Sequence, residues 1–572
     1  MKDPCWHDGC KVNLDRDENY TGHIDRRGIL LMDRMKRREF LKRVGIGVGA
    51  LATSQALPRL FLPGAYAQST GILTYGMAGG FDTLDVTATT FTRVGRIALH
   101  IIDPLVWSTG SGVYAPGLAT SWTVSPDATI YTFKLREDVR FHDGTPLTAE
   151  AVKVTFDRIV DPATRAQTAF SFIGPYDRSD VLDRYTVRVR FKSPHASFLN
   201  GASSPYLGII SPTAVQKFGQ DFGRLVFVGT GPFMLQSYRT DAEVRLIRNP
   251  NYTWGAPIFN HPGRSYLQSI VYRIVPEEAT RVATLETGET LFIEDVPVTD
   301  YQRLRSSRDK VLLEIRQAGS GWSLMMNQGR PPTDELAVRR AVMHAIDKEG
   351  LVRTVWNSVY KAACSPLTPN MFGFDSETCR KVPYNPDQAR RILDEAGWRV
   401  GPDGVRVKGS ERLRLEFYLQ TTPQKNIEMA QFIQANAKQV GIDVNLNVLA
   451  RAGYLDAVRQ SRHNFQFWWD TGTDPGQMLR ILFHSRNAGG GTNRNNYRNQ
   501  DMDRLIEQID GISDPTRRKE IIVRAQQKAI DDAVMVYLAD PPSLYAHDRS
   551  VSGVWVDWGG NYPYFFNTRV QR

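Results

Sequence analysis

The sequence predicts an α/β protein with more than one domain. The chain has 572 residues, which is more than one hydrophobic core usually organises. Its composition, with 41% hydrophobic and 23% charged residues, is typical of a soluble globular protein. Between residues 413 and 469 the apolar pattern changes repeatedly between the period of a strand and that of a helix, which indicates a β-α-β-α-β unit with parallel strands.

The β-α-β-α-β unit begins with a strand in which Leu413, Leu415 and Phe417 alternate with polar residues. A helix follows, and its apolar face consists of Ile427, Ala430, Ile433, Ala437 and Val440. The remaining predicted elements are a strand at 444–448, a short helix at 453–460 and a strand at 464–469. Ligands of open α/β sheets gather at the carboxyl ends of the strands, so the loops at 420–422 and 470–475 are predicted to face a ligand.

A second stretch, residues 114–152, predicts a strand, a turn and the start of a helix. Tyr131, Phe133 and Leu135 alternate with polar residues, as in a half-buried strand. Asp143 and Gly144 then predict a turn, because glycine accepts a positive φ without strain. Thr148 is expected to cap the following helix with its side chain.

This stretch also contains LATSW and, after a gap, FKLREDVRFHDGTPLTAE, which closely resemble the signature of the family 5 extracellular solute-binding proteins. Those proteins serve ABC importers of peptides, nickel chelates, opines and some sugars. The one local departure is Ala151, where the family usually has Asp. GTGPF at 229–233 and VRRAVMHAID at 338–347 also resemble the family, and the resemblance extends from Gly71 to Tyr545.

The resemblance implies the fold of a two-lobed periplasmic binding protein of type II, similar to the large peptide-binding proteins and carrying an extra inserted subdomain. The expected divisions are an N-terminal extension with a signal peptide at 1–67, lobe I at 68–114, the inserted subdomain at 115–214, lobe I again at 215–319, lobe II at 320–538 and a C-terminal segment of lobe I at 539–572.

The N-terminal region predicts export to the periplasm. Arg37 and Arg38 are followed by Glu-Phe-Leu-Lys, which resembles the twin-arginine motif, and a short apolar run comes next. An Ala-Tyr-Ala sequence ending at Ala67 provides a cleavage site, so the mature chain is expected to begin at Gln68. Because signals normally begin a few residues before the arginines, Met35 or Met32 is a plausible start of translation.

Cys364 and Cys379 are the only cysteines of the predicted mature chain. An exported protein with two cysteines 15 positions apart, on either side of a loop that contains Pro and Gly, suggests a structural disulfide. Two free buried thiols are the alternative.

The sequence contains no nucleophile motif and no metal-ligand spacing such as H-E-x-x-H or paired C-x-x-C. We therefore expect no enzyme activity, no metal and no cofactor. The formal net charge is +10, but no long Lys/Arg run lies in the main body, so nucleic acid is not an expected partner.

The sharpest candidate for binding is the adjacent pair Trp468 and Trp469 at the end of a predicted strand. Neighbouring side chains of a strand point to opposite faces, so one ring is expected in the core and the other exposed for stacking on a ligand. Burial of both rings is the alternative. In the peptide-binding relatives that the chain resembles, an Asp four residues before the Pro of this loop pairs with the ligand's α-amino group. Here that position is Thr471, and Asp470 is displaced by one.

The complete set of predicted ligand-binding residues combines the loop rule with the resemblance. It consists of Phe81, Trp322, Asn327, Thr421, Thr422, Trp468, Trp469, Asp470 and Thr471.

The expected function is the solute-binding component of an ABC importer, acting as a monomer between a small-molecule or peptide-like solute and a permease of the inner membrane. A secreted enzyme on the same fold and a sensor or chaperone-like protein are the alternatives. An enzyme would show turnover without a permease, and a sensor would bind a receptor or unfolded chains.

Overall fold

The computed structural model describes residues 71–571, apart from residues 90, 240, 422, 423 and 490, together with two short strands nearer the N-terminus. These strands, β1 (His23–Ile24) and β2 (Leu30–Leu31), pair antiparallel. The predicted signal residues Arg37, Arg38 and Ala67 and the predicted ligand residue Thr422 lie outside the described residues.

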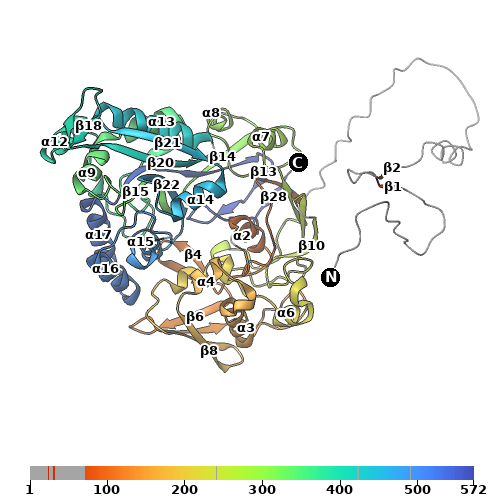
Figure 1. Cartoon of the computed structure of the whole chain (residues 1–572). Coiled ribbons are helices and arrows are strands. Elements are labelled where there is room, and N and C mark those ends of the chain that lie inside the picture. Colours follow the sequence, from red (N-terminus) through yellow and green to blue (C-terminus); the bar gives the residue numbers. More distant parts are fainter. Residues whose placement is uncertain are drawn as a thin grey trace, which may run out of the picture. The chain divides into compact units, whose positions relative to one another are not determined.

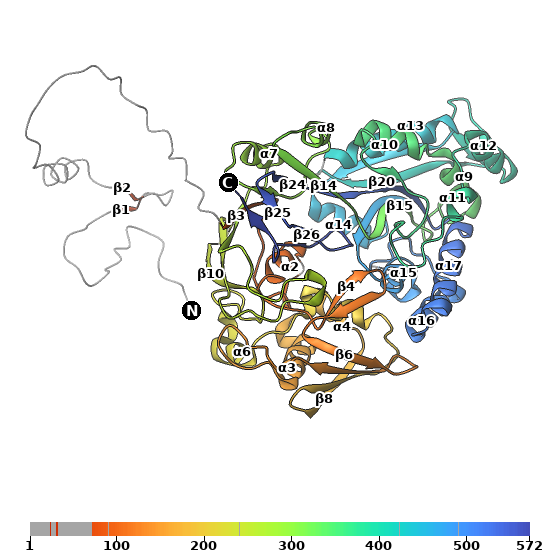
Figure 2. The same cartoon turned by 180° about the vertical axis from the view of Figure 1, so that it is seen from behind.

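A seven-stranded sheet forms lobe I, with the strand order β10-β11-β12-β3-β13-β24-β14 (Figures 1 and 2). Its three neighbouring strands β12, β3 and β13 are parallel, and every other pair is antiparallel. Leu73, Tyr75 and Met77 of the central strand are fully buried. The strands are β3 (Ile72–Met77), β10 (Phe233–Arg239), β11 (Glu243–Arg248), β12 (Ser269–Ile274), β13 (Phe292–Ile293), β14 (Lys310–Arg316) and β24 (Pro542–Asp548), and the helices of this lobe are α2 (Thr92–Ala98), α7 (Glu278–Glu286) and α8 (Tyr301–Arg305).

A buried carboxylate holds the loop after β3 in place. Glu294 accepts hydrogen bonds from the Tyr75 hydroxyl (2.5 Å) and from the backbone N–H of Ala78 (2.8 Å), and it forms an ion pair with Arg96. Burial alone would raise the pKa of Glu294, but Arg96 and these hydrogen bonds hold it below its ordinary value. Arg96 Nε also donates to the carbonyl of Asn561 (2.8 Å), so the same charge positions the C-terminal segment.

The expected inserted subdomain contains a separate four-stranded sheet, ordered β6-β7-β9-β8. Tyr131, Phe133 and Leu135 are buried, which confirms the alternation predicted for that strand. The sequence prediction for Thr148 is wrong: Thr148 precedes the helix with extended backbone, but its side chain makes no capping hydrogen bond. The elements are β6 (Ala119–Val124), β7 (Ile130–Leu135), β8 (Tyr176–Asp183), β9 (Thr186–Phe191), α3 (Ala149–Val160), α4 (Thr168–Ile173), α5 (Phe198–Ala202) and α6 (Pro212–Phe218).

Three small two-stranded sheets complete the first half of the molecule and the C-terminal segment. They pair β4 (Val106–Gly110) with β5 (Val113–Pro116), β25 (Val551–Ser552) with β28 (Arg569–Val570), and β26 (Trp555–Val556) with β27 (Pro563–Tyr564). Trp107 of β4 packs edge-on against Trp555 of β26 at 6.0 Å between ring centroids, so segments more than 400 residues apart share one core.

A six-stranded sheet forms lobe II, with the order β16-β23-β15-β22-β20-β21. Strand β20 is parallel to both β21 and β22, and this confirms the β-α-β-α-β unit predicted from the sequence. The strands are β15 (Gly319–Met326), β16 (Lys361–Ala362), β20 (Arg414–Gln420), β21 (Asp443–Leu449), β22 (Phe465–Thr471) and β23 (Met535–Asp540), and a small sheet adds β17 (Arg399–Val400), β18 (Arg406–Lys408) and β19 (Glu411–Arg412).

Nine helices of the described residues surround the sheet of lobe II, and several begin at a polar cap. Asn385 accepts from the N–H of Gln388, as its position before a Pro predicts, and Asp514 caps α17 in the same way. The helices are α9 (Leu336–Ala345), α10 (Lys348–Trp356), α11 (Thr378–Lys381), α12 (Pro386–Glu395), α13 (Gln424–Gln439), α14 (Arg451–Arg459), α15 (Pro475–Phe483), α16 (Gln500–Gly511) and α17 (Pro515–Asp531).

The described chain passes between the two large sheets at two places. It leaves β14 at Arg316 and enters β15 at Gly319, and it returns from β23 at Asp540 to β24 at Pro542. The crossings touch, because the N–H of Gln317 donates to the carbonyl of Pro541 (3.4 Å). The boundaries expected from the sequence, 319/320 and 538/539, lie within a few residues of these crossings.

Cys364 and Cys379 form a disulfide, with 4.7 Å between their Cα atoms. The loop that it closes is also fastened to α17, where the Gln526 side chain accepts from the Ser365 hydroxyl (2.7 Å) and donates to the carbonyl of Gly373 (2.6 Å). The bond thus belongs to the frame of lobe II and lies away from the predicted ligand residues in the sequence.

We expect Glu294→Gln to lower the stability of the protein by about 3 kcal/mol, because Arg96 would lose a buried ionic partner. The midpoint of urea-induced unfolding measures the effect. Glu289→Gln is the matched control, since Glu289 pairs with Arg273 at the surface and is 57% exposed. Equal midpoints for the two variants would contradict a structural role for the Glu294 network.

Candidate functional site

A narrow recess of about 70 Å³ separates the lobes, and it is lined from both sides. Lobe II contributes Thr471, the last residue of β22, and Thr473 from the loop that follows. The other wall contains aromatic side chains, among them Trp107, Trp558 and Tyr562. A short polar loop therefore faces an aromatic wall, which is the mixture of lining groups found in small-molecule sites, in a space smaller than such sites usually have.

The lobes also contact each other beside this recess. The Ser197 hydroxyl of the subdomain donates to Asp474 (2.8 Å), and Asp474 forms an ion pair with Arg518 (2.8 Å). Burial raises the pKa of Asp474, but Arg518 and the hydrogen bonds outweigh burial and lower it overall. Asn200 further accepts from the Thr473 hydroxyl. Asp474, which also caps α15, thus anchors the polar loop to the opposite lobe.

The C-terminal segment shapes the aromatic wall through one buried acid. Asp557 accepts from the backbone N–H groups of Gly559 (3.2 Å), Asn561 (2.7 Å) and Tyr562 (2.5 Å). Burial raises the pKa of Asp557 to about 6, although these bonds act in the opposite direction. Trp558 is fixed by a hydrogen bond from its Nε1 to the Ser108 hydroxyl (2.6 Å). Because Asp557 already accepts three backbone donors, it shapes the turn and offers little to a ligand cation.

A second recess, of about 220 Å³, lies on lobe II at the ends of β20 and β22. Trp322 and Trp469 stack there, with ring centroids 5.9 Å apart and planes at 12°. Trp469 is 45% exposed, and its Nε1 donates to the Gln317 side chain (3.2 Å) at the first crossing between the lobes. These two rings form an aromatic platform that a planar or sugar-like group can stack on.

Trp468 lies half-buried in the same recess and beneath a cation. The guanidinium carbon of Arg494 is 5.2 Å from the centroid of the Trp468 ring. Trp468 Nε1 is buried and has no partner among the described residues. Of the two alternatives from the sequence, burial of both rings is therefore wrong, since Trp469 is exposed and Trp468 is only partly covered.

Asp470 and Thr471 separate as strand alternation predicts. Thr471 lines the recess between the lobes, whereas the Asp470 carboxylate turns back to accept the N–H of Thr471 (2.8 Å). Burial raises the pKa of Asp470 to about 6, although the hydrogen bond from the N–H of Thr471 acts in the opposite direction.

Three other predicted ligand residues have different surroundings. Asn327, which was predicted to bind ligand, is fully buried and donates to the carbonyls of Ser461 (3.3 Å) and His463 (2.8 Å), so in this structure its side chain supports a loop. Phe81 is 8% exposed and stacks on Tyr238 at 5.4 Å. Thr421 is exposed at the end of β20, where its N–H donates to the carbonyl of Leu449 (3.0 Å).

The aromatic wall of lobe I was missed by sequence reasoning. Trp107 comes from a short hairpin, and Trp558 and Tyr562 come from the C-terminal segment. Tryptophans at 555 and 558 followed by Gly559-Gly560 are a usable signal, because an aromatic pair next to a tight turn is unusual at a solvated chain end.

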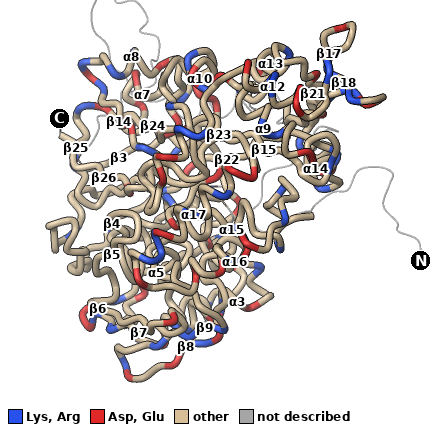
Figure 3. The backbone as a smooth tube through the Cα atoms, turned by 90° about the vertical axis from the view of Figure 1, so that its left-hand side faces the viewer, with Lys and Arg blue, Asp and Glu red and all other residues tan. Residues whose placement is uncertain are grey.

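The described residues contain no group of three or more His, Cys, Asp or Glu side chains that could hold a metal ion. Within the same residues, no helix has both the length and the apolar character that a membrane crossing needs. Basic and acidic residues are mixed along the chain rather than gathered on one element (Figure 3). His142, which lies in the signature turn, is bound through Nε2 to the carbonyl of Gly231 (2.9 Å) and has a structural role.

Two α/β lobes, two crossings and a lined recess between the lobes are the architecture of a two-lobed binding protein. Residues 113–490 match the model of the bacterial extracellular solute-binding proteins, family 5 (middle part). The chain belongs to this family, whose members are the solute-binding components of ABC importers.

Relatives of known function agree with the family. The chain is 28% identical over 447 residues to the glutathione-binding protein GsiB of Shigella flexneri serotype 5b, covering 77% of this chain and 83% of the relative. It is 27% identical over 497 residues to the probable D,D-dipeptide-binding periplasmic protein DdpA of Escherichia coli, with 84% and 91% covered.

Solved structures agree with the fold. The periplasmic binding protein DppA from Helicobacter pylori, in complex with the peptide STSA, superimposes with a TM-score of 0.71 at 25% identity, over 88% of this chain and 98% of that chain. NikA from Brucella suis, in complex with Fe(III)-EDTA, gives a TM-score of 0.77 at 24% identity, over 87% and 99%.

A buried acid lies at the second crossing between the lobes. Asp540 is the last residue of β23, and its Oδ1 has no hydrogen-bond partner among the described residues. Burial raises the pKa of Asp540 to about 7, although Arg316 and Lys348 act in the opposite direction. The folded protein therefore holds this carboxyl protonated at pH values where an unfolded chain would ionise it.

We expect stability to fall as pH rises, because the folded-state pKa of Asp540 lies above the unfolded value. The contribution is fully present below about pH 4 and is lost as pH rises through about 7, a change of about 3 kcal/mol between pH 5 and pH 8. Asp540→Asn should remove this part of the pH dependence of urea unfolding and stabilise the protein at pH 8. The exposed Asp309→Asn is the control, and an unchanged pH profile in Asp540→Asn would contradict the assignment.

Proposed function

We propose that this protein captures a peptide-like or related organic solute in the periplasm and delivers it, as a monomer, to an ABC permease of the inner membrane without catalysing a reaction. The observation that carries the proposal is the recess in which Thr471 and Thr473 of one lobe face Trp107, Trp558 and Tyr562 of the other. The printed ligands of the relatives, glutathione and a D,D-dipeptide among them, support a peptide-like solute.

Capture requires that the solute bind the closed form better than the open form, since only differential affinity shifts such an equilibrium. The aromatic wall and the Trp322–Trp469 platform supply apolar area that closure removes from water. The Ser197–Asp474–Arg518 contact supplies a polar latch between the lobes. The two crossings are the hinge in this proposal.

The solute is proposed to lack a free amino terminus at the Thr471 position. A buried ammonium group needs a carboxylate partner, because an unpaired buried charge is very costly. Thr471 offers only a hydroxyl, and the Asp470 carboxylate is turned toward the backbone, where it accepts the N–H of Thr471. Solutes that are N-blocked or sugar-like, stacking on Trp468 or Trp469, meet no such penalty.

We expect N-acetylated dipeptides to bind at least about tenfold more tightly than the same dipeptides with free amino groups. Thr471→Asp should strengthen binding of the free dipeptides, because it places a carboxylate in the recess. Thr421→Asp is the matched control, since Thr421 lies exposed at a neighbouring strand end. Isothermal titration calorimetry with Ala-Ala and N-acetyl-Ala-Ala measures both effects.

Micromolar binding of ordinary free peptides by the wild-type protein, lost in Asp470→Asn and retained in Thr471→Ala, would contradict the proposed charge preference while leaving solute capture intact. Mass spectrometry of the solute released from the denatured purified protein identifies what is carried. Release of no solute together with turnover of a test compound would contradict the binding function itself.

Export is proposed to use the twin-arginine route. Replacing Arg37 and Arg38 with Lys should abolish the periplasmic protein and leave uncleaved precursor, because the motif is read through its arginine pair. The control replaces Arg59 with Lys, an arginine that lies after the motif and before the cleavage site. Cell fractionation measures export, and N-terminal sequencing of the mature chain should begin at Gln68. Undiminished periplasmic protein in the first variant would contradict this route.

A further inference from the structure

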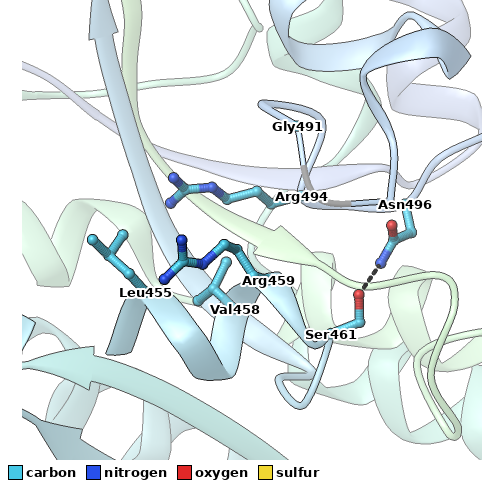
Figure 4. A pocket seen from close by; sticks show the side chains of 7 residues that line it. All are labelled: Leu455, Val458, Arg459, Ser461, Gly491, Arg494 and Asn496. Carbon is cyan, nitrogen blue, oxygen red and sulfur yellow. Dashed lines mark hydrogen bonds between the residues drawn. The ribbon is translucent and has the colours of Figure 1, made fainter. Parts of the chain in front are cut away.

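A third recess, in lobe II, is separate from the space between the lobes. It has a volume of about 210 Å³ and lies between the end of α14 and the loop of residues 491–496 (Figure 4). Leu455 and Val458 of α14 provide its apolar side, and Arg459, Ser461 and Arg494 provide polar groups. It shares no residue with the recess between the lobes but shares Arg494 with the aromatic recess.

The charge of this recess is entirely positive. No acidic side chain lines it, and neither Arg459 nor Arg494 forms an ion pair within the described part of the chain. The nearest acid along α14, Asp456, is already paired with Arg462 (2.9 Å). Figure 4 shows both guanidinium groups directed to the same side of the recess, beside Leu455. Two cations that converge without a counter-charge repel each other, and an anion relieves that repulsion.

The surrounding contacts hold the polar groups in place. Asn496 Nδ2 donates to the Ser461 hydroxyl oxygen (3.0 Å), which leaves the hydroxyl hydrogen free to donate into the recess. Asn496 Nδ2 also donates to the buried Asn327 side chain (2.9 Å). His463 binds the carbonyl of Arg494 through Nε2 (3.0 Å). Asn327, predicted from the sequence to touch ligand, is thus a positioning residue for this loop.

We propose that this recess binds a small oxyanion, a phosphate or a carboxylate, between Arg459 and Arg494 with the Ser461 hydroxyl as a further donor. Guanidinium groups match such anions through paired N–H donors. Because Arg494 also lies over the Trp468 ring, an anion here fixes one wall of the aromatic recess. The anion is either free in solution or an acidic group of a solute that extends from that recess.

Inorganic phosphate and acetate are the probes, titrated calorimetrically into the mature protein at constant ionic strength so that general screening cancels. We expect saturable binding in the wild type and a loss of at least about tenfold in affinity in both Arg459→Gln and Arg494→Gln. Arg451→Gln is the matched control, because Arg451 is an exposed arginine of the same helix that does not line the recess. It should bind as the wild type does.

A tryptophan readout tests the link to the aromatic recess. Phosphate should change the intrinsic fluorescence of the wild type, and Trp468→Phe should lose that change while retaining calorimetric binding. Repeating the titration on protein that carries its co-purified solute distinguishes the sources. If the bound solute competes with phosphate, the recess holds an acidic group of the solute. If phosphate binds independently of the solute, the recess holds a free anion. Both results support the site.

Two results would overturn the proposal. One is the absence of binding of either probe up to about 10 mM, and the other is equal affinity in the wild type, Arg459→Gln and Arg494→Gln. Neither of these two results depends on a transported solute, so they would not count against solute capture between the lobes. Conversely, a failure of solute capture would not count against anion binding in this recess.

Discussion

The position of every ligand-facing group depends on how the two crossings join the lobes. Gln317, in the first crossing, connects the two crossings and the aromatic platform. Its backbone N–H donates to the carbonyl of Pro541 in the second crossing, and its side chain accepts from Trp469. Gly319 follows with a φ of +139°, and a Cβ at that residue would lie 2.4 Å from the carbonyl oxygen of Asp470. No other residue type fits there without moving the backbone. The crossings between the lobes and the Trp322–Trp469 platform are therefore held together by direct contacts.

The two walls of the recess between the lobes differ in the polar groups that they present to a solute. The lobe I wall is held by carboxylates that are fully occupied internally, Glu294 by Arg96 and Tyr75, and Asp557 by backbone N–H groups. The lobe II loop presents hydroxyl groups at Thr471 and Thr473. A solute between them would meet aromatic surface and neutral donors. Arg494, which forms no ion pair among the described residues, lies beside Trp468 in the neighbouring aromatic recess.

The elements of lobe II were predictable because their contacts are local. Leu415, Phe417 and Val444 belong to strands in which apolar and polar side chains alternate within a few residues. The helix between these strands has its own apolar face. Strand alternation predicted that one ring of the Trp468–Trp469 pair would be exposed, but it did not say which. Trp469 lies on the same face as the buried Phe465 and Phe467 and is nevertheless 45% exposed. The contacts of Asn327 were not predictable, because a polar side chain at a strand end fits either a ligand or a loop, and its bonds to Ser461 and His463 join segments far apart in the sequence. The lobe I wall combines Trp107 with Trp558, and no local pattern relates segments so distant in the sequence.

The chain returns to lobe I through β24, which is an interior strand between β13 and β14, just after β23 has entered the interior of the other sheet. Both sheets are therefore split until residues 535–548 arrive. Before these residues arrive, β14 has no neighbour in one sheet and β16 has none in the other, although the remaining strands of each sheet can already pair. The last strand pairings in both lobes are therefore highly non-local, and a chain that stops short of β23 would expose unpaired strand edges in both lobes at once.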